Sequence, residues 1–147
     1  MIIAVTEANI AAAAVVHSAS WQDSHRAFCG PDFIAAHTPE RQEEYLRSEL
    51  KQGKKLYLLL EGRPVGLVSV QGNLIENLYV LPEEQRKGYG TQLLLFAVGQ
   101  CGGEPVLWVL SNNRKARALY TKHGFRDTGE SRVLSETLSE IEMRKSR

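Results

Sequence analysis

A loop with two glycines, Gly88 and Gly90, separated by a single residue, lies between an apolar run and an amphipathic run. The run Leu74–Leu81 is typical of a strand, and the residues from Tyr89 place apolar side chains on one helical face as far as Gly102. Pro105–Leu110 has the pattern of another strand. A strand, a crossover helix and a second strand in one sheet run parallel and with a right-handed connection. The centre of the chain therefore predicts an α/β fold.

The loop itself has the features of an anion site. Gly88 and Gly90 lie at the predicted helix start, where the first N–H groups have no intrahelical partner and the helix dipole is positive. Arg86 and Lys87 add local positive charge. Two glycines after a strand are also common in ordinary turns. The spacing excludes two known phosphate loops, because Thr91 stands where a Walker loop has lysine and Leu93 stands where a dinucleotide fingerprint has its third glycine.

The rest of the chain supplies further elements around this unit. Thr6 is a plausible N-cap for an Ala-rich helix to about Arg26, and Thr38 caps a second helix to about Lys51. Cys29–His37 is a turn-rich interruption between them. The other predicted elements are strands at Met1–Val5, Leu56–Leu60, Val65–Val70, Phe125–Arg132 and Glu136–Met143, and a helix at Asn112–His123. This predicts one domain, 1–147, with a mixed, mostly antiparallel sheet of about seven strands and four helices.

The whole segment around the two glycines resembles a family motif. Gln85-Arg86-Lys87-Gly88-Tyr89-Gly90 is similar to the Q/R-x-x-G-x-G/A pyrophosphate loop of the GNAT superfamily of N-acetyltransferases, and Leu78-Tyr79-Val80-Leu81-Pro82 is similar to the strand before it. The resemblance implies acetyl-coenzyme A as cofactor. It also implies that the main-chain N–H groups of Arg86 to Thr91 bind the pyrophosphate. The edge of Leu78, Tyr79 and Val80 would pair with the pantetheine amides as an added strand.

A second motif follows about 30 residues later. Asn113, Ala116, Leu119, Tyr120, Gly124 and Phe125 match the family's N-x-x-A-x-x-L/F-Y-x-x-x-G-F signature. Asn113 and Tyr120 are seven residues apart, so both project from one helix face and could touch one elongated ligand. The resemblance implies that Asn113 hydrogen-bonds the pantetheine or phosphate region and that Tyr120 is the general acid for the leaving thiolate. A phenol is protonated at neutral pH, as that role requires.

The residues that handle the acceptor are less well determined. Glu76, on the strand leading into the loop, is a candidate general base, and it equally fits a solvated position on the face it shares with Leu78 and Val80. Trp21, Asp23, His25 and Phe28, in and after the first predicted helix, are candidates for acceptor binding. The basic run Arg114–Arg117 is either a solvated face or a site for the nucleotide 3′-phosphate.

The charge, the apolar runs and the cysteine spacing of the chain limit the kinds of partner that it can bind. With 18 Lys and Arg against 17 Asp and Glu, the net charge of +1 gives no field to hold nucleic acid. No apolar run approaches the ~20 residues that span a bilayer, and the N-terminus lacks a basic segment before its apolar run. Cys29 and Cys101 have no metal-ligand or redox spacing, so no metal is expected. We expect a cytoplasmic protein, and relatives suggest a homodimer.

These observations predict an enzyme that transfers acetyl from acetyl-coenzyme A directly to the primary amine of a small molecule. One alternative acceptor is a peptide or protein N-terminus. A second alternative is a non-catalytic acyl-coenzyme A sensor that keeps the loop but transfers nothing.

Overall fold

The computed structural model describes residues 1–147 and contains seven strands in one sheet. The strands are β1 (Ile2–Ala4), β2 (Lys55–Leu60), β3 (Pro64–Gln71), β4 (Leu74–Val80), β5 (Val106–Leu110), β6 (Phe125–Val133) and β7 (Ser139–Lys145). The helices are α1 (Ile10–His25), α2 (Pro31–Ala35), α3 (Pro39–Lys51), α4 (Tyr89–Gln100) and α5 (Arg114–Lys122), with a 3₁₀ turn, η1, at Pro82–Glu84. The predicted mixed fold with seven strands is confirmed.

The sheet has the order β1-β2-β3-β4-β5-β7-β6. Strands β1 to β4 form an antiparallel meander, as the tight turns between β2, β3 and β4 predict. Strand β5 runs parallel to β4 after the crossover helix α4, and β7 inserts antiparallel between β5 and β6. The parallel unit predicted from the centre of the chain is therefore confirmed.

Two local predictions were wrong. The interruption at Cys29–His37 contains the short helix α2, which begins at Pro31, so the protein has five α-helices where four were expected. Proline is favoured at this first helical position because it has no N–H to leave unpaired. Thr6 does not cap α1: the N-cap is Asn9, and the Thr6 hydroxyl accepts a hydrogen bond from the Ala8 N–H instead. Thr38 does cap α3, accepting from the Arg41 N–H at 3.2 Å.

Two apolar clusters cover opposite faces of the sheet. One joins α4 and α5 to the strands and includes Leu93, Leu94 and Phe125. The other joins α1 and α3 to the strands and includes Ile10, Leu46 and Leu67. Each helix thus buries its apolar side against the sheet, and the two clusters stabilise the α1 face and the α4 face separately. No helix of the protein is both long enough and apolar enough to cross a bilayer.

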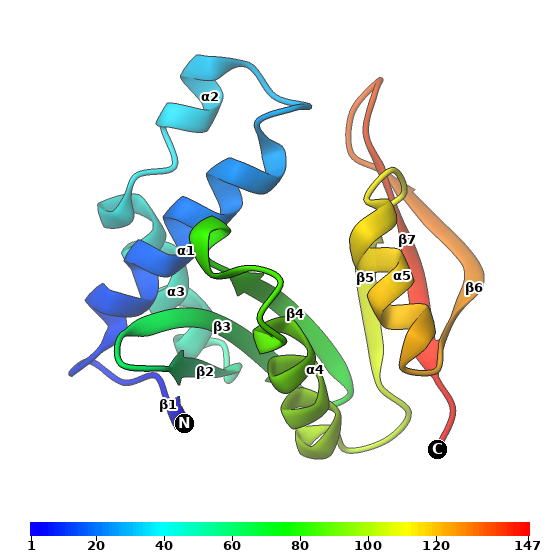
Figure 1. Cartoon of the computed structure of the whole chain (residues 1–147). Helices are drawn as coiled ribbons and strands as arrows, with labels where there is room; N and C mark the ends of the chain where they lie inside the picture. The colour runs from blue at the N-terminus through cyan, green and yellow to red at the C-terminus, as the bar shows by residue number, and fades with distance from the viewer.

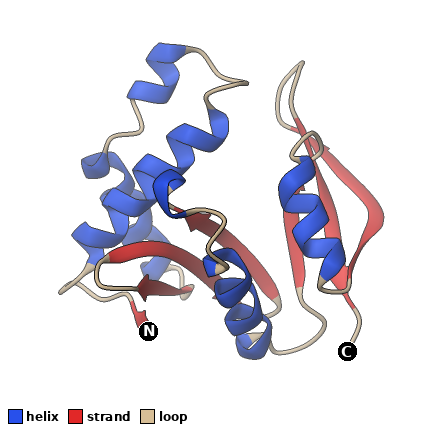
Figure 2. Ribbon diagram, in the orientation of Figure 1, coloured by secondary structure: helices blue, strands red, loops and turns tan.

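The sheet opens in its middle, between β4 and β5. Only Leu74 with Val106 and Ile75 with Leu107 are paired there, whereas β5 and β7 are paired along five residues on each strand. Beyond Ile75 the two strands diverge into a V, with α1 and the η1 loop above one arm and α5 in front of the other (Figure 1; Figure 2). The opening exposes main-chain groups of β4 that have no partner strand, and a ligand can pair with them.

Candidate active site

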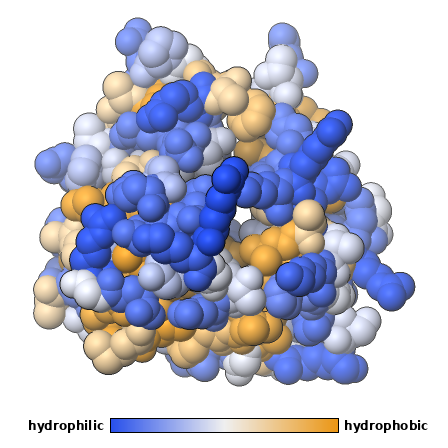
Figure 3. Space-filling view, in the orientation of Figure 1, coloured by the Kyte–Doolittle hydropathy of each residue, from blue (hydrophilic) through white to orange (hydrophobic).

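The V between β4 and β5 holds a large cleft. It has a volume of about 740 Å³, and its walls come from the end of α1, β4, the loop before α4, β5 and α5. In the space-filling view, apolar surface lies within the hollow between the two halves and hydrophilic side chains surround it (Figure 3). This size and composition suit an organic ligand with a few polar groups.

The glycine loop forms one end of this cleft. Gly88 is the N-cap of α4 with φ 84°, and no side chain caps this helix, so its first N–H groups remain available. Arg86 also has a left-handed backbone, with φ 67°. Loops of this kind gather N–H groups into an anion-binding concavity. The loop thus has the local geometry expected of a phosphate site.

The predicted loop residues divide into two groups in the structure. Those that line the cleft are Gln85, Arg86, Gly88, Tyr89, Gly90 and Thr91, together with Leu78, Tyr79 and Val80 of β4. The side chain of Lys87 turns aside to Glu84, at 2.9 Å, and that hydrogen bond raises the pKa of the Lys87 amine. Arg86 is therefore the nearer basic side chain to the site.

A β-bulge in β4 changes which side chains face which side. The pairing of β3 with β4 shifts between Leu67 and Ser69, and Asn77 has the left-handed φ of 54° that asparagine tolerates better than most residues. Leu78 and Val80 pack on the α4 side, whereas Tyr79 packs on the α1 side. Glu76 also reaches the α1 side, through Lys54 and α3. The prediction that Glu76 shares a face with Leu78 and Val80 was therefore wrong.

Tyr120 lies in the wall of the cleft on α5. Its ring is 8% exposed and packs against Phe125, with the ring centroids 6.0 Å apart. Burial raises the pKa of its hydroxyl to about 12. The phenol is therefore fully protonated at neutral pH, as a proton donor to a leaving group must be.

Asn113 is the N-cap of α5 and also lines the cleft. Its side-chain oxygen accepts a hydrogen bond from the Ala116 N–H at 3.1 Å. The amide Nδ2 takes no part in this cap. Asn113 thus has a structural role that the motif alone did not indicate, beside the ligand role that the resemblance implies.

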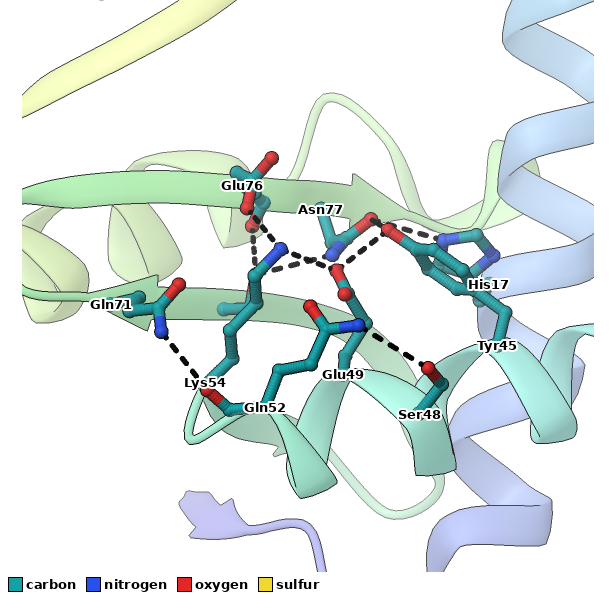
Figure 4. A network of polar contacts seen from close by, with 10 residues as sticks. His17, Tyr45, Ser48, Glu49, Gln52, Lys54, Gln71, Glu76 and Asn77 are labelled. Carbon is teal, nitrogen blue, oxygen red and sulfur yellow. Dashed lines mark hydrogen bonds and ion pairs between the residues drawn. The ribbon is translucent and has the colours of Figure 1, made fainter.

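Below the bulge, a polar network joins β4 to α1 and α3 (Figure 4). Gln42 donates to His17 Nδ1 at 2.7 Å, which leaves His17 Nε2–H to donate to Asn77 Oδ1 at 3.2 Å. Tyr45 donates to Glu49 at 2.9 Å and contacts Asn77 Oδ1 at 3.3 Å. Burial lowers the pKa of His17 to about 4, so its ring is neutral. This network holds the bulge in place.

Glu76 is tied to the same network. Its Oε1 accepts from Lys54 Nζ at 2.8 Å, and Lys54 also donates to the buried Glu49 at 2.8 Å (Figure 4). Burial opposes the charge of Lys54, but hydrogen bonds to Glu49 and Glu76 outweigh it and raise the pKa of the amine. Glu76 lines the cleft, so it remains a candidate base, with one carboxylate oxygen engaged by a permanent cation.

The predicted acceptor residues at the end of α1 are only partly in the cleft. Asp23, His25 and Phe28 line it. Trp21 does not; its ring stacks between His25, at 4.1 Å, and His37, at 3.6 Å. Burial lowers the pKa of His25, which favours its neutral form. Trp21 thus fixes the end of α1 rather than forming the cleft surface.

Sequence reasoning missed several residues that also line the cleft, among them Ser20, Trp108 and Glu140. Ser20 is 3% exposed, and its hydroxyl has no hydrogen-bond partner in the protein. Such a group costs roughly 1–3 kcal/mol unless a ligand satisfies it. The alternation of β5 and β7 could have indicated that Trp108 and Glu140 share a face, but not that this face meets the cleft.

Comparisons with known proteins agree with this site. The model of the acetyltransferase (GNAT) domain matches residues 52–127, which is more than half of the chain and includes the glycine loop and Tyr120. The chain therefore belongs to the GNAT acetyltransferase family. The resemblance seen in the two motifs is confirmed.

Solved structures share the fold over the full length. PaiA N-acetyltransferase from Thermoplasma acidophilum, solved with coenzyme A, has a TM-score of 0.78 at 20% identity, covering 100% of this chain and 98% of that one. A GCN5-related N-acetyltransferase from Rhodopseudomonas palustris has a TM-score of 0.77 at 22% identity, covering 100% and 95%. A ribosomal-protein-alanine N-acetyltransferase from Brucella melitensis has 0.70 at 17%, covering 100% and 99%. No curated protein matches the sequence.

Proposed function

We propose that this protein transfers the acetyl group of acetyl-coenzyme A directly to a primary amine of a small molecule. The observation that carries the proposal is the arrangement of the cleft, in which an uncapped helix start lies at one end and a buried, protonated Tyr120 in the wall. Family membership supplies the class of reaction. The acceptor is the part that family membership leaves open.

Coenzyme A fits the groups that the cleft offers. The N–H groups at the start of α4, with Arg86 beside them, suit a pyrophosphate. The unpaired main chain of β4 from Leu78 to Val80 suits the pantetheine amides, since an extended ligand can add to a free strand edge. The structure of the PaiA relative was solved with coenzyme A, which supports this assignment.

The chemical step needs an acid for the thiolate and a deprotonated amine. The amine attacks the thioester carbonyl, which an N–H group near Val80 would polarise, and Tyr120 donates a proton to the departing sulfur. The attacking nitrogen, which is positively charged in the tetrahedral intermediate, gives up one proton as it becomes the amide nitrogen, and this proton restores Tyr120. Glu76 is the sequence candidate for the base that first deprotonates the acceptor, and this role stays a prediction.

Of the two candidate acceptors, a small amine and a protein N-terminus, we propose the small amine because of the side chains that border the cleft. Side chains from the end of α1 and from the β6–β7 turn, including Phe28 and Leu134, border the cleft. We propose that these side chains border the space beside the coenzyme and that a small amine binds there. The cytoplasmic location, the homodimer and the single-domain boundary 1–147 stay predictions.

The test is replacement of Tyr120 by phenylalanine. The ring packing against Phe125 is kept, so stability and coenzyme A affinity should stay within experimental error, while kcat for thiol release falls on the order of 10²-fold. Thiol release is measured with a panel of primary amines. Tyr57→Phe, at a tyrosine that packs on Phe96, is the matched control. An unchanged kcat in Tyr120→Phe would rule out the assigned acid, and coenzyme A binding without thiol release for any amine would favour the sensor.

A further inference from the structure

The arm of the cleft formed by β5 and β7 carries the carboxylate of Glu140, which lies on the α1 side of the sheet. Leu107 pairs with Met143 and Val109 with Ile141, and these four pack on the α4 side. Residues between them alternate to the other face, so Trp108 and Leu110 share a face with Glu140. Both Trp108 and Glu140 line the cleft.

Glu140 is held in a fixed position. Its carboxylate pairs with Arg132 on the neighbouring strand at 2.6 Å, and the Arg132 guanidinium lies 3.7 Å above the Trp108 ring. Arg132 itself does not line the cleft. Arg132 thus fixes one carboxylate oxygen of Glu140.

Tyr79 approaches from the opposite arm. The bulge turns its ring to the α1 side, where it packs edge-on against the His17 ring with centroids 5.1 Å apart. Burial raises the pKa of the Tyr79 hydroxyl, so this phenol stays protonated at neutral pH. Tyr79, on β4, and Glu140, on β7, therefore line the same cleft from opposite arms.

A third polar group points to a ligand in this space. Ser20, on the part of α1 that borders the cleft, has its buried hydroxyl without a partner. Two more carboxylates, Asp23 and Glu76, line the cleft on the α1 side. Their cationic partners, Arg26 and Lys54, do not line it, so the cleft surface on this side is acidic.

We propose that Glu140 and Tyr79, together with Ser20, bind the ammonium group of the acceptor, and that the acceptor amine has no carboxylate beside it. This inference rests on the proposed acetyl transfer and names its substrate class. An ammonium has three donors, which the Glu140 carboxylate and two hydroxyl oxygens can accept. A carboxylate next to the amine would meet Asp23, Glu76 and Glu140 and be repelled.

The experiment compares amines that differ only in a carboxylate: tyramine with tyrosine, histamine with histidine, and cadaverine with lysine. Wild-type protein should favour the amine of at least one pair by about tenfold or more in kcat/KM. Glu140→Gln should raise KM for that amine about tenfold and reduce the preference, with coenzyme A affinity unchanged. Glu142→Gln is the matched control, because Glu142 lies two residues along the same face, contacts Thr128 and does not line the cleft.

Further variants separate binding from structure. Tyr79→Phe and Ser20→Ala should each raise KM for the same amine several-fold, and Ser20→Ala should not lower the melting temperature, since it removes an unpaired hydroxyl. Glu76→Gln tests the base and should lower kcat more than it raises KM. An acceptor KM that Glu140→Gln leaves unchanged would overturn the inference, as would a general preference for the amino acids.

Calorimetry with coenzyme A-saturated protein distinguishes failure of this inference from failure of the proposed function. Amine binding that weakens in Glu140→Gln, without thiol release, would support the subsite and refute the transfer. Thiol release from all three amines with no effect of Glu140→Gln would support the transfer and refute the subsite. Absence of binding by all three amines would also refute the subsite.

Discussion

The two halves of the cleft are built in different ways. The half that we propose for coenzyme A comes mainly from one continuous stretch, Leu78–Thr91, and offers chiefly main-chain groups at a strand edge and a helix start. The half that we propose for the acceptor is assembled from side chains on three separate elements, α1, β4 and β7. The first depends on local backbone conformation and the second on how the elements pack.

The two halves should therefore tolerate different amino-acid substitutions. A main-chain site keeps its ligand while its side chains vary, provided that the backbone geometry is kept. A side-chain site changes its ligand when a single residue changes. The same fold can therefore keep one cofactor and use different acceptors, and substitutions in the two halves should have separable effects.

The largest separable effect is expected at Gly88. Valine there must adopt a φ near 84°, and its side chain would project where the loop approaches the coenzyme. We expect coenzyme A affinity to fall about 100-fold, which corresponds to roughly 3 kcal/mol. Titration calorimetry measures the affinity, and urea denaturation measures the free energy of unfolding.

Gly62→Val is the matched control for the backbone strain. Gly62 lies in the β2–β3 turn with φ 76°, and like Gly88 it has open space around a new Cβ. Both variants should lose similar stability, on the order of 1–2 kcal/mol. Only Gly88→Val should lose coenzyme affinity; equal losses of affinity in both variants would mean that strain, and not the loop, explains the effect.

The same contrast explains what the sequence could predict. The loop, the segment around Tyr120 and the parallel unit are local patterns. The resemblance of the first two to family motifs was enough to nominate the loop and Tyr120. The bulge at Asn77 was not predictable, because alternation alone puts Glu76 on the face of Leu78. Glu140 was missed because only the insertion of β7 beside β5 brings it to the cleft.

The packing beneath the acceptor half should make stability depend on pH. Burial lowers the pKa of His17 to about 4, below the value of roughly 6.5 expected in the unfolded chain. The unfolded chain therefore binds more protons between these values, and stability is lost as the pH falls through this window. We expect the free energy of unfolding to fall by about 2 kcal/mol from pH 8 to pH 5 through this group. Urea denaturation across this range measures it.

His17→Gln should remove most of this dependence, because glutamine carries no proton in this range and can still hydrogen-bond to Asn77 or Gln42. His123→Gln, at the end of α5 and away from the network, is the control and should keep the slope. Coenzyme A affinity of the folded protein should change little in either variant, since His17 does not line the cleft. A slope that survives in His17→Gln would show that another group carries it.

The smallest expected effect concerns Asn113, which caps α5 and also lines the cleft. Its Oδ1 makes the cap, while its Nδ2 takes no part in it. Asn113→Ala should lose about 1 kcal/mol of stability, as should Thr38→Ala at the equivalent cap of α3, which lies outside the cleft. Thr38→Ala should leave coenzyme A affinity unchanged.

Asn113→Ser separates the two roles. A serine hydroxyl can accept from the Ala116 N–H and so keep the cap, but it cannot reproduce the reach of the amide donor. If Asn113 binds coenzyme A, this variant should keep its stability within about 0.5 kcal/mol and lose affinity about three- to tenfold. If affinity is kept as well, Asn113 acts on the coenzyme half only by fixing the start of α5, and the amide contact implied by the family motif does not form in this protein.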